Sequence, residues 1–406
     1  MIAKFRVDAL CLSLSLLLTA VLFIPVAAFV VGEDDYRSHL VAVDNLVRGQ
    51  PFGEFVRQIP HFLFHLLVLS VYRTLAVTPL TNAAAGVALF GYLAGTAAIY
   101  GLFSALAGRA TSYRTGLLYA TLSLSLMLVM PINLLTPYNR YLGYLIPHAY
   151  HNPTMVVLKP LALALFYLAA RCFDVRALRS PTAYTAGTGV VTLACTLAKP
   201  SYVIALAPAL MLAAAHALRR GAALHLRPLV YGILLPIAVV VALQMISLSD
   251  RPGVVIAPLG VFYEWARILN PHTTTNLPLK FVLSILFPLL VYLVGLREAR
   301  GTPYLNLAWL TFGFGAAYTY LVAEPGAYMA LGNFTWSGQI SVFVLFVASA
   351  VFLLGWATRA AAHRSAKVTA SLAVIAVVFS LHLVSGLQWY GLHTGWLPMG
   401  YIIAVW

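Results

Sequence analysis

The sequence contains few charged residues and little cysteine. Charged side chains make up 9% of the 406 residues, hydrophobic residues 62%, and the mean hydropathy is +0.89. Soluble domains carry about a quarter charged residues, so water is not the main solvent of this chain. The cysteines fall in or at the ends of apolar segments, which gives neither a disulfide framework nor metal-ligand spacing. They are Cys11, Cys172 and Cys195.

Several motifs of well-known enzymes are also missing. The sequence has no phosphate-binding loop, no dinucleotide fingerprint, no nucleophile elbow and no H-E-x-x-H pair. ATP hydrolysis, dinucleotide binding and zinc proteolysis therefore have no support. The net charge of +14 does not indicate nucleic acid, because the basic residues lie between hydrophobic runs, where they set membrane orientation.

Apolar runs long enough to cross a membrane recur from one end of the sequence to the other. A helix needs about twenty residues to cross a hydrocarbon core of roughly 30 Å. The runs are continuous and do not alternate as barrel strands do, so the sequence predicts an all-α polytopic membrane protein with a single domain over residues 1–406. We expect eleven spans, at 9–31, 80–107, 115–133, 153–171, 183–199, 201–217, 228–247, 279–296, 303–321, 335–357 and 369–387.

Charge asymmetry predicts the orientation. If the shorter segment 60–78 lies at the surface as a juxtamembrane helix, fifteen of the 25 Lys and Arg residues fall in short loops on the side of the N-terminus, which the positive-inside rule assigns to the cytoplasm. Eight of the eleven acids then lie on the extracytoplasmic side of a cytoplasmic (inner) membrane. The main outer segments are 32–79, 134–152 and 248–278, and smaller ones follow at 322–334 and 388–406.

An acidic cluster directly follows the first predicted span. Glu33, Asp34 and Asp35 are consecutive, and neighbouring carboxylates repel one another unless a cation compensates. Such a group at a membrane boundary indicates a functional site. The alternative is a solvated tip in which Asp34 or Asp35 caps the next helix and Arg37 neutralises the excess charge.

Cations gather around a second predicted helix start. Asn152 before Pro153 is typical of a helix N-terminus. The Asn side chain accepts hydrogen bonds from free backbone N–H groups, and a Pro at the first helical position loses no helical hydrogen bond. A helix N-terminus flanked by cations can bind phosphate. A lysine within the membrane is costly unless it has a function or snorkels to the interface. The candidate cations are Arg140, His148, His151, Lys159 and Lys199.

Two further pairs have simpler interpretations. Glu264 and Arg267, three residues apart, predict an ion pair on a helix surface. His61 and His65 would share one face of a helix and are a weak candidate for a metal site.

The order of these features resembles the GT-C superfamily of membrane glycosyltransferases. The shared pattern is a cytoplasmic N-terminus, one span, and an outer loop that opens with acids and continues into membrane-lying helices. The stretch from Pro60 resembles the juxtamembrane helix where many members have His-Pro-Pro-Leu, although the prolines after His61 are missing here. The break at Lys199 resembles a lysine-proline break common in such enzymes. The second outer loop lacks the acid often found there.

The resemblance implies an inverting glycosyltransferase that works outside the cytoplasm. Its donor would be a sugar on a polyprenyl phosphate, and its acceptor a lipid, glycan or protein. Asp34 or Asp35 would be the general base, with Glu33 less favoured. The substrate-binding candidates are Glu33, Arg37, Arg140, His148, His151, Asn152, Lys159 and Lys199.

Other functions remain open at this stage. A transporter or lipid flippase, or an oligosaccharide polymerase or ligase, would also be polytopic. Charged residues facing a cavity within the spans, or two repeated halves, would favour a transporter, and the sequence shows neither. The sequence names no cofactor, and a divalent cation stays open.

Overall fold

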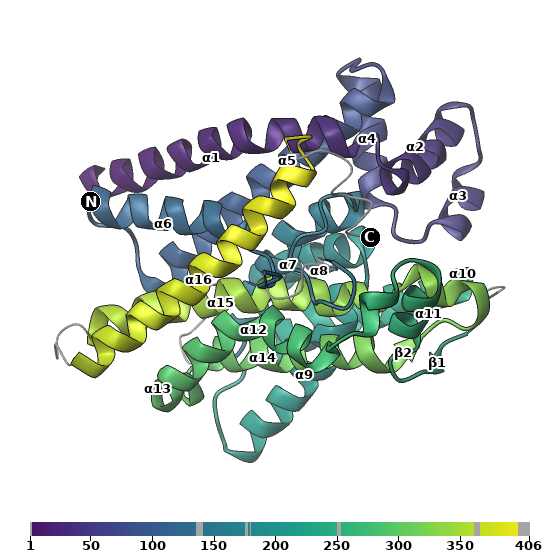
Figure 1. Cartoon of the computed structure of the whole chain (residues 1–406). Helices are drawn as coiled ribbons and strands as arrows, with labels where there is room; N and C mark the ends of the chain where they lie inside the picture. The colour runs from purple at the N-terminus through teal and green to yellow at the C-terminus, as the bar shows by residue number, and fades with distance from the viewer. Residues whose placement is uncertain are drawn as a thin grey trace.

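The computed structural model is all-α apart from one short β ladder. It describes residues 2–134, 141–174, 178, 180–249, 253–360 and 366–396, and of residues 2–6, 34, 360 and 367 only the backbone. Long helices lie side by side, and shorter ones gather at one end (Figure 1). The all-α prediction is confirmed.

Sixteen α-helices form within the described residues. Their bounds are α1 Ile2–Val30, α2 Asp34–Val47, α3 Phe52–Gln58, α4 Leu63–Thr74, α5 Leu80–Leu102, α6 Tyr113–Leu126, α7 Pro153–Arg171, α8 Pro181–Ala198, α9 Ser201–Arg219, α10 Leu235–Ser247, α11 Gly260–Ile268, α12 Leu277–Val294, α13 Leu296–Arg300, α14 Pro303–Leu321, α15 Thr335–Ala360 and α16 Ala366–Leu392. Short 3₁₀ or π segments are η1 Phe103–Ala107, η2 Pro228–Leu234, η3 Pro271–Thr274 and η4 Gly326–Leu331, and strands β1 Val255–Ile256 and β2 Val322–Ala323 pair antiparallel.

Eight helical segments within the described residues are long and apolar enough to cross a membrane, rather than the eleven expected. The chain is therefore a multi-pass membrane protein by the length and hydropathy of its helices. The eight are Val7–Val30, Leu80–Ala107, Pro153–Arg171, Ser201–Arg219, Pro228–Ser247, Leu277–Val294, Gly326–Arg359 and Val368–Leu392.

The three other expected spans differ from these for identifiable reasons. The span expected at 115–133 corresponds to α6, which has 14 residues and ends at Leu126. The spans expected at 183–199 and 303–321 form helices α8 and α14 of 18 and 19 residues. Threonines in α8, and Asn306 and tyrosines in α14, make them less apolar than the eight. Helix α4, within the segment expected to lie at the surface, has 12 residues and is too short to cross.

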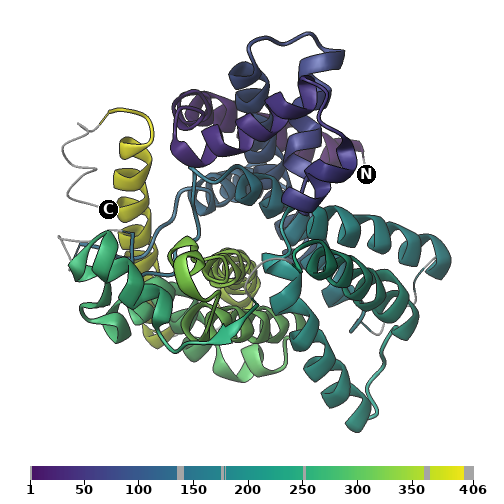
Figure 2. The same ribbon diagram turned by 90° about the vertical axis from the view of Figure 1, so that its right-hand side faces the viewer.

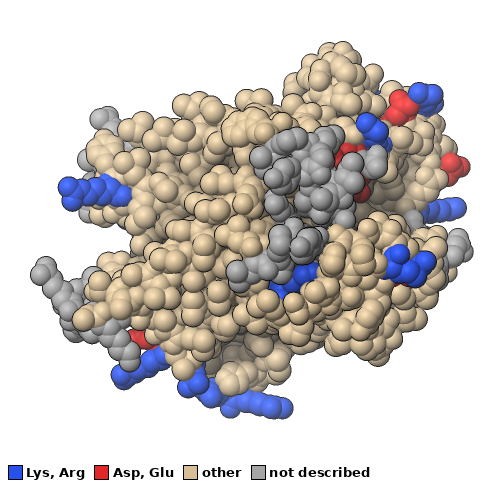
Figure 3. All heavy atoms as spheres, viewed as in Figure 1, with Lys and Arg blue, Asp and Glu red and all other residues tan. Residues whose placement is uncertain are grey.

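The two ends of the helix bundle differ in charge. We call the end formed by α2, α3, α4, α11 and the β ladder the acidic end, because most of the carboxylates visible in Figure 3 lie there, among several Lys and Arg side chains. The opposite end, with the N-terminus, α13 and the last turn of α9, shows mostly Lys and Arg on that face, and we call it the basic end.

Helix α15 lies in the middle of the bundle. Figure 2 views it nearly end-on, with other helices around it, and 78% of its most apolar stretch is buried. The same measure is 22% for α16, which packs on the outside. Gly315 and Gly338 allow α14 and α15 to pack closely, because a Cβ on Gly315 would lie 2.6 Å from the Ser337 carbonyl oxygen.

Residues 127–134 and 141–152, which we call the inner segment, are almost entirely buried although they form no helix. Residues 141–152 belong to the predicted second outer loop, so this part of that loop lies inside the protein. Irregular backbone is tolerated deep in a membrane protein only where other protein groups form hydrogen bonds with its N–H and C=O groups. His382 of α16 does this, because its Nδ1 lies 2.6 Å from the Met130 oxygen and its own carbonyl accepts from Met130 N–H at 3.1 Å.

Candidate functional site

Helix α2 carries the acidic cluster away from the first span and toward α7. Glu33 is the N-cap of α2 and Asp34 its first residue, so the interpretation that Asp34 or Asp35 caps this helix is wrong. The side chain of Glu33 makes no capping hydrogen bond. The side chain of Asp34 lies outside the described residues. Asp35 is half-buried, and its carboxylate accepts a hydrogen bond from Asn152.

Asn152 joins three parts of the chain at the start of α7. Its Oδ1 accepts from Met155 N–H at 2.9 Å, which caps the helix, and this confirms the predicted helix start. Its Nδ2 donates to Asp35 Oδ2 at 2.7 Å. Lys199 Nζ lies 3.4 Å from the same Oδ1 and donates to Thr154 Oγ1 at 3.1 Å. One amide therefore positions a carboxylate and an ammonium at one helix N-terminus.

Lys199 is buried but keeps polar and aromatic partners. It follows α8, and its Nζ lies 4.4 Å from the centre of the Trp336 ring, a cation–π contact. Burial lowers the pKa of Lys199 from 10.5 to about 8, and the charge of Asp35 opposes this shift. The ammonium form therefore predominates at neutral pH, beside the free N–H groups of α7.

His151 lies in the same group. Burial lowers its pKa to about 4, with Asp35 acting in the opposite direction and Lys199 in the same one, so the imidazole is neutral at pH 7. Its Nε2 lies 3.4 Å from the Tyr141 hydroxyl, and its ring stacks on that of His393 at 6.1 Å between centroids. His151 can thus bind a ligand through hydrogen bonds but not as a cation.

A histidine pair connects α2 to α4 beside this group. His39, one turn after Asp35, lies with its Nδ1 2.9 Å from His65 Nε2. Burial lowers the pKa of His39 to about 4, assisted by the charge of Lys199, and that of His65 to about 3, assisted by His39. Both rings are neutral at pH 7, and their hydrogen bond holds α2 against α4.

His148 and Lys159 form a separate buried pair. Lys159 Nζ lies 2.7 Å from His148 Nδ1, and His148 Nε2 lies 2.8 Å from the Leu126 oxygen. An ammonium only donates and a carbonyl only accepts, so Nδ1 is the acceptor and Nε2 carries the proton. Lys159 is 1% exposed and faces the Phe343 ring at 5.3 Å. This pair helps to fix the inner segment against α6 and α7.

The remaining predicted residues lie elsewhere. Arg37 is exposed on α2, and Arg140 lies outside the described residues. His61 precedes α4, so it does not share a helix face with His65, which pairs with His39 instead. Among the described residues, no three His, Cys, Asp or Glu side chains are close enough together to hold a metal ion.

Sequence reasoning missed the aromatic wall of the site. Trp389 stacks on Tyr141 at 5.3 Å between centroids and donates from Nε1 to the His148 oxygen at 2.9 Å. Trp389 lies in the last turn of α16 and His393 directly follows that helix, about 240 residues after His151, and Trp336 lies in the first turn of α15. Aromatic residues at span ends are typical of membrane interfaces, so their positions in the sequence do not indicate that these side chains converge.

The comparisons with known proteins add no assignment. The chain matches no model of a known protein family, no curated protein and no solved structure.

Proposed function

We propose that the chain is an integral-membrane glycosyltransferase of GT-C type. It moves a sugar from a polyprenyl-phosphate donor to a lipid-linked, glycan or protein acceptor at the extracytoplasmic face. The observation that carries this proposal is the contact of Asp35 with Asn152, whose amide also meets Lys199 at the N-terminus of α7. A proton acceptor and a phosphate-binding group lie together there.

The reaction requires these two functions. The acceptor hydroxyl oxygen attacks the anomeric carbon, the bond from that carbon to the phosphate oxygen breaks, and polyprenyl phosphate leaves with the electron pair. Asp35 takes the hydroxyl proton. Lys199 and the first N–H groups of α7 stabilise the negative charge on the phosphate. Attack opposite the leaving group inverts the anomeric carbon.

The proposed orientation places the acidic end outside the cytoplasm. Arg220 directly follows α9 and Arg300 ends α13, both at the basic end, so the positive-inside rule assigns that end to the cytoplasm. Nucleotide sugars are absent from the outer face, which favours a lipid-linked donor. The long apolar helices provide a path for the polyprenyl chain.

Transfer by purified protein tests the proposal. Protein in detergent is given a radiolabelled polyprenyl-phosphate sugar and a panel of acceptors, and the new glycosidic product is counted. We expect Asp35→Asn to lower the rate by about 10²–10⁴-fold, the usual contribution of a general base. Asp34→Asn is measured in parallel, because the cluster predicts either aspartate.

Asp44→Asn is the matched control. Asp44 lies on the same helix but forms a surface ion pair with Arg48, at 2.7 Å from Nε to Oδ2, so its loss should leave the rate unchanged. Full turnover by both Asp34→Asn and Asp35→Asn would rule out the general base. If wild-type protein moves the intact donor between the two leaflets of a vesicle membrane and forms no glycosidic bond, the chain is a flippase rather than a transferase.

A further inference from the structure

A large cavity lies at the basic end, between α9 and α14. Its volume is about 990 Å³, at the upper limit of the roughly 300–1,000 Å³ typical of ligand sites. Residues from the ends of α9, α12 and α13 and from the first four turns of α14 line it. None of these residues belongs to the group around Asp35, so the cavity is a second site.

Two arginines from different segments meet at this cavity. Arg220 follows the last turn of α9, and Arg300 ends α13. Both side chains are exposed, and within the described part of the chain neither forms an ion pair. Figure 3 shows blue side chains along this lower edge of the molecule. A cavity with two uncompensated guanidinium groups favours an anionic ligand, and phosphate fits their paired N–H donors.

Helix α14 contributes polar side chains to the same cavity. Asn306 lines it next to Arg300, because its Nδ2 donates to the Arg300 oxygen at 2.9 Å. The indole N–H of Trp309, also in the lining, has no acceptor among the described residues.

The rest of the lining is apolar and runs along the membrane. The lining follows α14 from Pro303 to Ala317, about 21 Å at 1.5 Å per residue, which is about two thirds of a roughly 30 Å hydrocarbon core. Leu212 of α9 and Leu310 and Phe314 of α14 face this length. A free nucleotide or sugar phosphate would leave this surface unused, whereas a lipid tail would cover it.

We infer that this cavity binds one anionic phospholipid, with its phosphate at Arg220 and Arg300 and one acyl chain along α14. The arginines lie at the ends of apolar helices, where headgroups are found, and the lining continues into hydrocarbon depth. The site is separate from the proposed transfer reaction and does not depend on it.

Gly313 allows the acyl part of the site to be tested. Gly313 lines the cavity, and a Cβ added there would meet no atom within 4 Å, so Gly313→Leu is chosen to occupy part of it. Gly86→Leu, on α5 and also in open space, is the matched control outside the cavity. Arg220→Gln/Arg300→Gln removes the headgroup contacts. Arg109→Gln/Arg114→Gln is its control, because it removes two cations close to α6 that do not line the cavity.

Native mass spectrometry of the full-length chain in detergent measures the binding. The probes are phosphatidylglycerol, phosphatidylcholine with the same acyl chains, and inorganic phosphate. We expect phosphatidylglycerol to bind roughly tenfold or more tightly than phosphatidylcholine, and the double arginine variant to abolish this difference. Gly313→Leu should weaken both lipids, and both controls should bind as wild type does.

Three results would overturn the inference. The first is equal binding of the two lipids to wild-type protein. The second is equal loss of binding in the arginine variant and its control, which would indicate unspecific attraction to positive charge. The third is competition by millimolar inorganic phosphate with no effect of Gly313→Leu, which would indicate a free-anion site. Thermal unfolding of each variant checks that the exposed substitutions leave the fold intact.

Discussion

The acidic and basic ends use cations in opposite ways. At the acidic end, Lys199 is buried, held by Asn152 and Thr154, and its pKa falls to about 8. At the basic end, Arg220 and Arg300 are exposed, and among the described residues no carboxylate pairs with them. A fixed, partly desolvated ammonium suits a charge that develops during a reaction. Exposed guanidinium groups suit a permanent charge on a mobile headgroup.

Among the predicted variants, Asn152→Ala should have the largest effect that is confined to the acidic end. The substitution removes the partner of Asp35 and of Lys199, so we expect transfer to fall by about 100-fold, while phosphatidylglycerol binding stays unchanged. Loss of the α7 cap should also lower the free energy of unfolding by about 1 kcal/mol.

Ser112→Ala provides the control for that capping effect. Ser112 caps α6 by accepting from Thr115 N–H at 3.3 Å, far from the Asp35 group in sequence. Ser112→Ala should lower the free energy of unfolding by a similar amount without lowering the rate of transfer. Equal losses of transfer in both variants would show that Asn152 acts only through the stability of the protein.

The pH dependence of donor binding tests the state of Lys199. Below about pH 8 the ammonium is charged and binds phosphate, so donor affinity should fall about tenfold per pH unit above that value. The stability of the fold should instead rise with pH. Between about pH 8 and the ordinary value of 10.5, the Lys199 side chain holds a proton in the unfolded chain but not in the folded chain, so the free energy of unfolding rises.

Lys199→Arg sharpens this test. Arginine remains charged over the same range, so titration calorimetry of a polyprenyl phosphate should show affinity that no longer changes from pH 7 to 10. A fall in affinity that persists in Lys199→Arg would assign the titration to another group. Phosphatidylglycerol binding at the basic end should be flat in both proteins, because arginines hold that headgroup.

How much of the molecule could be predicted depended on the range of the interactions. Hydrophobic runs predicted the helices, and the local pairs at Asn152–Pro153 and Glu264–Arg267 are present as expected. Three spans were overcounted for two reasons. Helices α8 and α14 are less apolar than the eight candidate spans. The span expected at 115–133 runs into the buried, irregular inner segment that follows α6, which apolar residues alone do not distinguish from a span. That segment depends on groups of α16 more than 250 positions away, such as His382.

The candidate site shows the same limit. Asp35, Asn152 and Lys199 were each singled out, but nothing in the sequence indicated that one amide contacts the other two. His39 and His65 pair because α2 and α4 fold against each other, which a search for histidines four residues apart cannot reveal. Arg220 and Arg300 were used only to orient the chain, since their shared cavity is formed by packing.

The histidine pair should make the acidic end sensitive to low pH. The unfolded chain binds protons as pH falls through 6.5, whereas His39 and His65 stay neutral until about pH 4 and 3. The free energy of unfolding should therefore fall from pH 6.5 to about 4, by at most about 1.4 kcal/mol per pH unit for each ring. Thermal unfolding of His39→Gln/His65→Gln should show a shallower slope, and exposed His216→Gln at the basic end should not.

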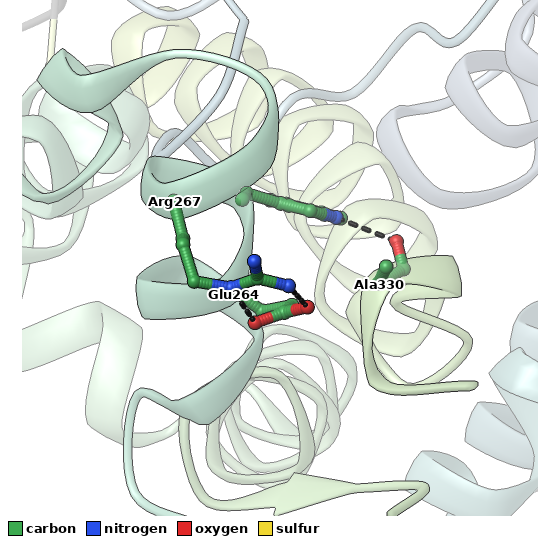
Figure 4. A network of polar contacts seen from close by, with 4 residues as sticks. Glu264, Arg267 and Ala330 are labelled. Atoms are coloured by element: carbon green, nitrogen blue, oxygen red, sulfur yellow. Dashed lines mark hydrogen bonds and ion pairs between the residues drawn. The ribbon is translucent and has the colours of Figure 1, made fainter. Parts of the chain in front are cut away.

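The smallest effect is expected at α11, where a surface ion pair and a partly buried hydrogen bond lie within one turn (Figure 4). Arg267 pairs with Glu264, at 2.9 Å from Nε to Oε2, and the arginine is 69% exposed. Trp265 is 9% exposed and donates from Nε1 to the Ala330 oxygen at 2.7 Å.

Arg267→Ala should change the free energy of unfolding by no more than about 0.5 kcal/mol, because water competes for an exposed pair. Trp265→Phe should cost about 1–3 kcal/mol, since it leaves a carbonyl without its donor. If chemical denaturation shows the reverse order, the exposed ion pair contributes more to the stability of α11 than the buried hydrogen bond does.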